Sequence, residues 1–121
     1  MMLDSNIIID YLNGDKHVGS QIDSWRKSGR VLFISHISVI ETLSLGTLSP
    51  AQIEHIKIFL DDFIVLSLDM HISLAAAKLR REHSLALADS IIVASAIVNN
   101  LPLATRDKKL RSLPGIAIAE L

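Results

Sequence analysis

The chain has 121 residues, a formal net charge of −1 and no cysteine, which predicts one domain over residues 1–121 and excludes disulfides and thiolate metal sites. Half of the residues are apolar and only 4% are aromatic, so the core is built from aliphatic side chains, and an aromatic surface for stacking bases is not expected. The near balance of charge argues against a strongly basic nucleic-acid-binding face.

No segment has the features of a membrane span or a secretion signal. The longest nearly apolar stretch, residues 85–98, carries Asp89 in its middle and is too short to cross a bilayer. The start lacks the cationic and apolar pattern of a signal peptide. We therefore expect a cytoplasmic protein without membrane contact.

Short apolar runs rich in β-branched residues alternate with helical patterns, which predicts βαβ units around a parallel sheet. A continuous apolar run such as residues 31–34 is typical of a strand that is covered on both faces. The elements expected in the first half are a strand at 1–4, helices at 6–12 and 17–28, a strand at 31–34, and a helix at 39–45 with Ser38 as its N-cap.

Helix signals are stronger in the second half. Ser49 to Gln52 combine an N-cap, a proline at the first helical position and a glutamine at the third, so a helix begins there and ends near Asp61. The other elements expected are a strand at 63–66, a helix from the cap Asp69 to Glu82, a helix at 86–98, a strand at 101–104, a short turn or helix through Leu113, and an edge strand at 116–118.

Four acids stand at the polar ends of apolar elements: Asp4, Glu41, Asp89 and Asp107. If the strands at 1–4 and 101–104 are neighbours, Asp4 and Asp107 leave the sheet at the same carboxyl edge. Glu41 can reach that edge from the helix after the second strand, and Asp89 from the first turn of its helix. The pattern predicts that these four acids converge.

Converging carboxylates repel one another unless a cation compensates, so the pattern also predicts a bound divalent metal. Mg²⁺ and Mn²⁺ prefer oxygen ligands, and the hydroxyl and amide groups of Ser5, Asn6 and Thr105 lie beside the acids in sequence. Such a metal activates water and neutralises charge on a phosphodiester.

A basic cluster follows the last apolar strand. Arg106, Lys108, Lys109 and Arg111 surround Asp107, and we expect this cluster to contact phosphates of a substrate. Ser5, Asn6 and Thr105, beside the acids, are further predicted substrate-binding residues.

Each acid also has a purely structural interpretation. Ser38 and Glu41 have the spacing of a capping box, in which the glutamate bonds back to the helix start. Asp89 could complement a helix dipole, and Asp107 could be a turn residue. Asp4 is harder to explain in this way, because a carboxylate in a buried crevice is costly without a partner.

The four segments that hold these acids resemble the four motifs of PIN-domain ribonucleases, in the family's order and over nearly the whole chain. The segments are Leu3-Asp4-Ser5-Asn6-Ile7-Ile8-Ile9-Asp10, Ser38-Val39-Ile40-Glu41, Leu87-Ala88-Asp89-Ser90-Ile91-Ile92-Val93-Ala94-Ser95-Ala96 and Leu103-Ala104-Thr105-Arg106-Asp107. The size and motif order are most similar to those of the toxins of VapBC-type toxin-antitoxin pairs.

The resemblance implies an α/β fold, a three-layer α/β/α PIN-like domain with a central parallel sheet of four to five strands, usually a homodimer. It also implies that Asp4, Glu41, Asp89 and Asp107 are catalytic, metal-binding acids, that RNA is cleaved with Mg²⁺ or Mn²⁺, and that a cognate antitoxin protein blocks the site. One departure is that Lys108, Lys109 and Leu110 stand where many relatives carry another acid and an aromatic residue. This departure implies weak binding of a second metal, or a one-metal site that the substrate completes.

The leading hypothesis is therefore a metal-dependent endoribonuclease, the toxin of a toxin-antitoxin pair. A phosphoryl-transfer domain of the haloacid-dehalogenase kind would use Asp4 as nucleophile, but Asn6 stands where that chemistry wants a second acid. A non-catalytic module, with acids that serve as caps and an apolar surface that binds a partner, is the third hypothesis.

Overall fold

The computed structural model describes residues 1–121, which form four strands and seven helices. In chain order these are β1 (Met2–Leu3), α1 (Ser5–Leu12), α2 (Lys16–Lys27), β2 (Phe33–Ser35), α3 (His36–Leu43), α4 (Pro50–Leu60), β3 (Ile64–Leu66), α5 (Met70–His83), α6 (Leu87–Val98), β4 (Leu103–Ala104) and α7 (Lys108–Arg111). None of these helices combines the length and apolarity needed to cross a bilayer.

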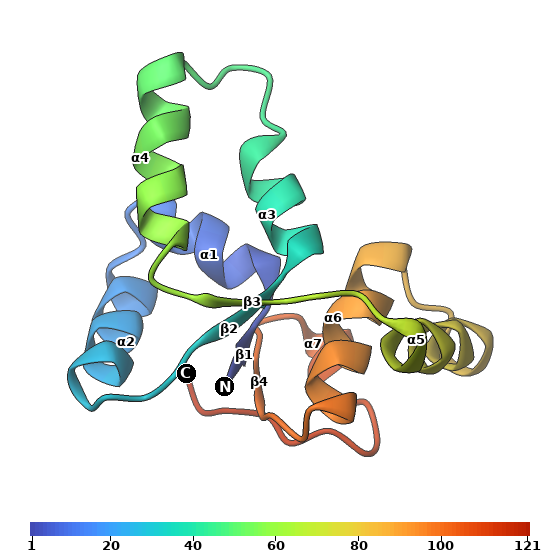
Figure 1. Ribbon diagram of the computed structural model, residues 1–121. Coiled ribbons are helices and arrows are strands. Elements are labelled where there is room, and N and C mark those ends of the chain that lie inside the picture. The colour runs from blue at the N-terminus through green and yellow to red at the C-terminus, as the bar shows by residue number, and fades with distance from the viewer.

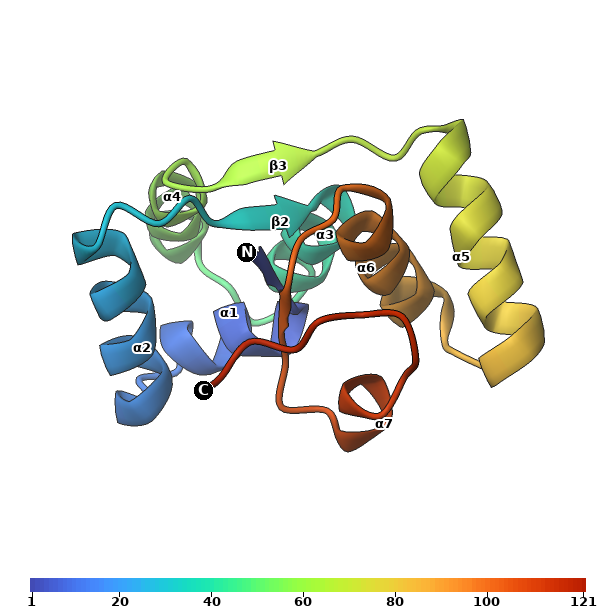
Figure 2. The same ribbon diagram turned by 90° about the horizontal axis from the view of Figure 1, so that it is seen from below.

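The four strands form one parallel sheet in the order β3-β2-β1-β4, which confirms the predicted central parallel sheet. Met2 lies opposite both Phe33 of β2 and Leu103 of β4, so β1 is an inner strand. Figure 2 shows β2 and β3 side by side with their arrows in the same direction.

Side chains that alternate along each strand supply two separate cores. Leu3 and Ile34 pack with residues of α1, α2 and α4. Met2 and Leu103 point the other way and pack with residues of α5, α6 and α7. In Figure 1 these two groups of helices lie on opposite sides of the sheet. The predicted three-layer α/β/α architecture is therefore confirmed.

The predicted start of the third helix is wrong. β2 continues through Ser35, whose hydroxyl accepts a hydrogen bond from the backbone N–H of Ile37 at 3.1 Å, so α3 begins at once with His36. Ser38 therefore lies inside the helix, fully buried, instead of capping it.

The edge strand predicted at 116–118 is reduced to one parallel bridge between Leu103 and Ile118. Leu103 donates its N–H to the carbonyl of Ala117 at 2.8 Å, and its own carbonyl accepts from Ala119 at 2.9 Å. Because β4 has only two residues, it offers little backbone for a longer fifth strand to pair with.

Parallel strands bring their carboxyl ends to one edge of the sheet, where ligands bind in open α/β folds. Asp4 follows β1, Ser35 ends β2 and Thr105 follows β4 at this edge. The helices α1 and α3 begin there as well.

Candidate active site

Asp4 and Thr105 join the ends of the two neighbouring strands β1 and β4. Asp4 is 2% exposed and occupies the N-cap position of α1, yet its side chain makes no capping bond. Its Oδ2 instead accepts from the Thr105 hydroxyl at 2.7 Å. The same Thr105 oxygen accepts the backbone N–H of Asp107 at 3.1 Å, so one hydroxyl links two of the four acids.

Ser5 connects α1 to the acid on α3. Its hydroxyl donates to Glu41 Oε1 at 2.7 Å and lies 2.8 Å from the Ser38 hydroxyl, which is left to donate to it. The capping-box interpretation of Ser38 and Glu41 is therefore wrong, because both side chains contact Ser5 instead of the start of their own helix.

Asp107 and Asp89 stand at the starts of two helices. Asp107 caps α7, with Oδ1 accepting the backbone N–H groups of Lys109 at 2.8 Å and Leu110 at 3.3 Å. Asp89 lies half-buried in the first turn of α6. The local structural interpretations of both residues are thus compatible with the geometry, and they leave carboxylate oxygens unused.

Charge repulsion connects the four acids in pairs: Asp4 with Asp89 and Asp107, and Asp89 with Asp107 and Glu41. Burial raises the pKa of Asp4, the Thr105 hydrogen bond opposes this effect, and the charges of Asp89 and Asp107 raise the pKa further. Burial, Asp107 and Glu41 raise the pKa of Asp89, while Lys109 lowers it. A cation among these side chains would relieve the repulsion.

The donor set suits Mg²⁺ or Mn²⁺, because all the donors are oxygens. Hydrogen bonds engage one oxygen each of Asp4, Glu41 and Asp107. No buried side-chain nitrogen or oxygen lacks a partner, so the unused oxygens reach solvent. No three His, Asp or Glu side chains are grouped so that they could hold a metal ion by themselves. A bound ion would therefore take most of its ligands from waters or substrate oxygens.

The residues predicted to bind substrate divide into two groups. Asn6 and Lys108 are exposed, and the Lys109 ammonium donates to the carbonyl of Ser84 at 3.1 Å while its charge acts on Asp89. Ser5 and Thr105 are buried and hold the acids.

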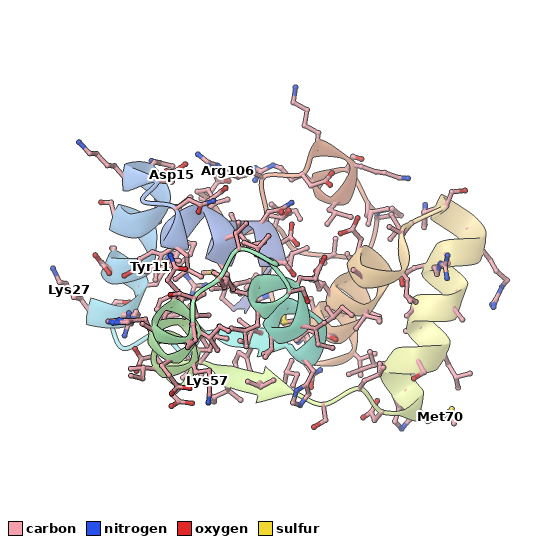
Figure 3. The ribbon with its side chains drawn as sticks, turned by 90° about the horizontal axis from the view of Figure 1, so that it is seen from above. Tyr11, Asp15, Lys27, Lys57, Met70 and Arg106 are labelled. Atoms are coloured by element: carbon pink, nitrogen blue, oxygen red, sulfur yellow. The ribbon has the colours of Figure 1, made fainter.

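Arg106 has a different set of contacts. Its Nη1 donates to Asp10 Oδ2 at 3.0 Å and to Asp15 Oδ2 at 2.7 Å. Figure 3 shows Arg106 beside Asp15 at the start of α2. The sequence did not predict three of the residues that contact the site: Asp10, Asp15 and Ser38. Their partners lie far away in the chain, so no local sequence pattern indicates these contacts.

Comparisons with known proteins show the family and the fold of this chain. The family model of the PIN domain matches residues 1–116. The chain belongs to the PIN domain family. This membership and the resulting fold were predicted from the four motifs and are confirmed. No protein with curated function is detectably similar in sequence.

Solved structures show the same PIN fold. A chain of a toxin-antitoxin complex from Klebsiella pneumoniae is 28% identical with a TM-score of 0.83, and the match covers 96% of this chain and 94% of that one. VapBC2 from Rickettsia felis, bound to a DNA fragment of its promoter, is 20% identical with a TM-score of 0.83 and coverages of 98% and 96%. FitAcB from Neisseria gonorrhoeae is 24% identical with a TM-score of 0.78 and coverages of 98% and 96%.

Proposed function

We propose that this PIN domain is an endoribonuclease that depends on Mg²⁺ or Mn²⁺ and acts as the toxin of a toxin-antitoxin pair. The observation that supports the proposal is the mutual effect of four acids from separate elements: burial together with the charges of Asp89 and Asp107 raises the pKa of Asp4, and burial together with the charges of Asp107 and Glu41 raises that of Asp89. Membership of the PIN domain family supports a nuclease activity.

The four acids would hold the divalent ion. When bound, that ion activates a water and offsets charge on the phosphodiester. Ser5 and Thr105 orient Glu41 and Asp4 through their hydrogen bonds. Lys109, whose charge acts on Asp89, and the exposed Lys108 would bind flanking phosphates of the RNA.

The alternative phosphoryl-transfer reaction has no support in the structure. Its second acid would stand at position 6, where an exposed Asn is found. The non-catalytic module is compatible with the cap role of Asp107. A cleavage experiment therefore separates it from the nuclease.

We also propose an antitoxin protein as partner, supported by the toxin-antitoxin complexes among the structural neighbours. A groove of about 280 Å³ between α1, α3 and α4 is a candidate binding site for an apolar segment of the partner. Its lining includes Ile9, Leu12, Leu45, Leu48 and Ile56. A cationic side chain from such a partner could reach the acids and block them.

The test is cleavage of a structured RNA by purified, antitoxin-free protein with Mn²⁺. We expect chelator to abolish cleavage, and the Asp4→Asn/Asp89→Asn double variant to be at least roughly 100-fold slower than wild type, because a lost ligand costs more than a lost outer contact. Asp23→Asn is the matched control, since Asp23 is an exposed acid on α2.

Equal cleavage by the wild type and the double variant would show that the activity belongs to a contaminant. That result would contradict the proposed nuclease function. Absence of both cleavage and Mn²⁺ binding, together with stoichiometric capture of a small protein encoded beside this chain, would favour the non-catalytic module.

A further inference from the structure

The guanidinium of Arg106 is held by two carboxylates from the opposite end of the chain. Asp10 belongs to α1 and Asp15 is the N-cap of α2, and they lie 96 and 91 residues away in sequence. Both acids accept from the same nitrogen, Nη1, which uses both of its N–H groups. The contact therefore joins the segment after β4 to the α1–α2 turn.

That segment carries two groups of the candidate site. Thr105 donates to Asp4 and accepts from the backbone of Asp107, and Arg106 stands between them. Arg111 adds a bond from its Nη1 to the carbonyl of Thr105 at 3.0 Å. Displacement of Arg106 would shift the peptide that places Asp107 relative to Asp4.

We propose that Arg106 is a positioning residue, which clamps the segment 105–107 onto Asp10 and Asp15 and thereby holds Thr105 and Asp107 in place beside Asp4. The inference rests on the proposed metal-dependent nuclease and replaces the phosphate contact predicted for Arg106 from the sequence. We call these three residues, Arg106, Asp10 and Asp15, the clamp.

The charges favour the clamp over a phosphate contact. Two carboxylates around one guanidinium leave a net negative charge, which repels an RNA backbone. Arg106 is 42% exposed on its side chain, and exposed ion pairs contribute little to global stability. Loss of the clamp should therefore act locally, on the placement of the acids, with little change in the melting temperature.

The experiment removes the clamp from each side. Arg106→Gln removes the guanidinium charge. Asp10→Asn/Asp15→Asn removes both acceptor charges, and the amide oxygen that it places at position 15 can still accept the capping bond from Val18. Arg106→Lys keeps the charge. Arg26→Gln is the matched control, because Arg26 also forms an exposed ion pair, with Asp62, which includes no residue of the clamp or of the candidate site.

Three measurements are made on each protein. Calorimetry gives the Mn²⁺ affinity, kinetics give kcat and KM with RNA at several salt concentrations, and hydrogen exchange follows the amides of residues 105–107.

We expect Arg106→Gln and the Asp10/Asp15 double variant to weaken Mn²⁺ binding by a similar factor, on the order of 10-fold, as for other groups that orient metal ligands. We also expect faster exchange at 105–107, lower kcat, little change in KM and an unchanged salt dependence. Arg106→Lys should lie nearer to wild type, and Arg26→Gln should match it.

A phosphate contact would give the opposite pattern. Arg106→Gln would then raise KM and reduce the slope of log affinity against log salt by about 1, with Mn²⁺ affinity intact. That result, or unchanged Mn²⁺ affinity in both clamp variants, overturns the proposal. If wild type neither binds Mn²⁺ nor cleaves RNA, the proposed function and the positioning role both fail, whereas exchange at 105–107 would still show whether the clamp exists.

Discussion

Asp4 is the only one of the four acids that is buried, and burial is the main reason that its pKa is raised. The fold therefore binds the proton of this carboxyl more tightly than the unfolded chain does. Its ionised form lowers the stability of the metal-free protein at neutral pH. That cost fades as the pH falls through the raised pKa toward the ordinary value of 3.8.

Asp4→Asn should accordingly raise the melting temperature in chelator, by about 4 °C for each kcal/mol of relieved repulsion and desolvation in a domain of this size. The amide oxygen of Asn can still accept from Thr105. The gain should be largest near pH 7.5 and shrink on acidification. Added Mn²⁺ should reverse the order, because it stabilises only the protein that binds it.

Thermal melts of both proteins in chelator and in Mn²⁺, between pH 4.5 and 7.5, measure this effect. Asp23→Asn, at an exposed position, should follow wild type throughout. A melting temperature of Asp4→Asn below that of wild type at every pH in chelator would show that the Asp4 charge does not destabilise the metal-free fold.

Sequence patterns predict the four acids as the candidate site but do not predict the side chains that contact them. Asp4 and Asp107 could be predicted to lie together because the ends of parallel strands meet at one edge. The spacing of Ser38 and Glu41 is that of a capping box, so the sequence predicts Ser38 as the N-cap of a helix. Their common contact is Ser5, 33 and 36 residues away, and no local pattern encodes a bond over that distance.

At the level of elements, the best-predicted features are helix ends fixed by local hydrogen bonds. The capping box of Ser49 and Gln52 is present as predicted, and Asp69 caps α5 through a bond from the N–H of Ile72 at 2.9 Å. The strand bounds were less predictable, because strand length depends on the pairing partner and not on the local sequence alone. β1 and β4 have only two residues each, where the sequence predicts strands at 1–4 and 101–104.

A buried hydrogen bond between Ser5 and Ser38 is one of the contacts between α1 and α3. Ser5→Ala should lower the free energy of unfolding by about 1–3 kcal/mol, because it leaves the buried Ser38 hydroxyl without this partner. The Ser5→Ala/Ser38→Ala double variant should recover part of that loss, since both partners are then absent. Mn²⁺ affinity should stay reduced in both, because Glu41 has lost its donor.

Urea unfolding and calorimetry on the two variants separate stability from ligand placement. Ser20→Ala, at an exposed site of α2, is the control and should change neither quantity appreciably. Equal stability of the single and double variants would mean that Ser38 does not depend on Ser5.

At the level of the whole molecule, the family and the layered fold could be predicted because four weak motifs occur together in a fixed order. The surface was less predictable, since exposure depends on how the helices pack. α5 buries Ile72, Ala76 and Leu79, but its outer face carries Met70 and Leu74, which are 70% and 63% exposed. Figure 3 shows Met70 at the outer end of this helix.

Met70 and Leu74, one helical turn apart, form an apolar patch on this face, and the exposed Leu68 and Leu87 line a cavity of about 230 Å³ between α5 and α6. A patch of exposed large apolar side chains is typical of an interaction surface. We expect it to carry the predicted homodimer, because a helix face with apolar residues one turn apart can pack against its own symmetry copy. Leu74 would then occur on both sides of the interface.

Leu74→Lys should therefore weaken dimerisation by at least about 100-fold, since it removes the burial of two leucines at about 1.5–3 kcal/mol each and places like charges together. Light scattering coupled to size exclusion, over a range of concentrations, measures the shift to monomer. Ile58→Lys is the matched control, because Ile58 is 67% exposed on α4, on the other side of the sheet. A wild type that is monomeric at every concentration, or a dimer disrupted by Ile58→Lys and not by Leu74→Lys, would contradict this assignment.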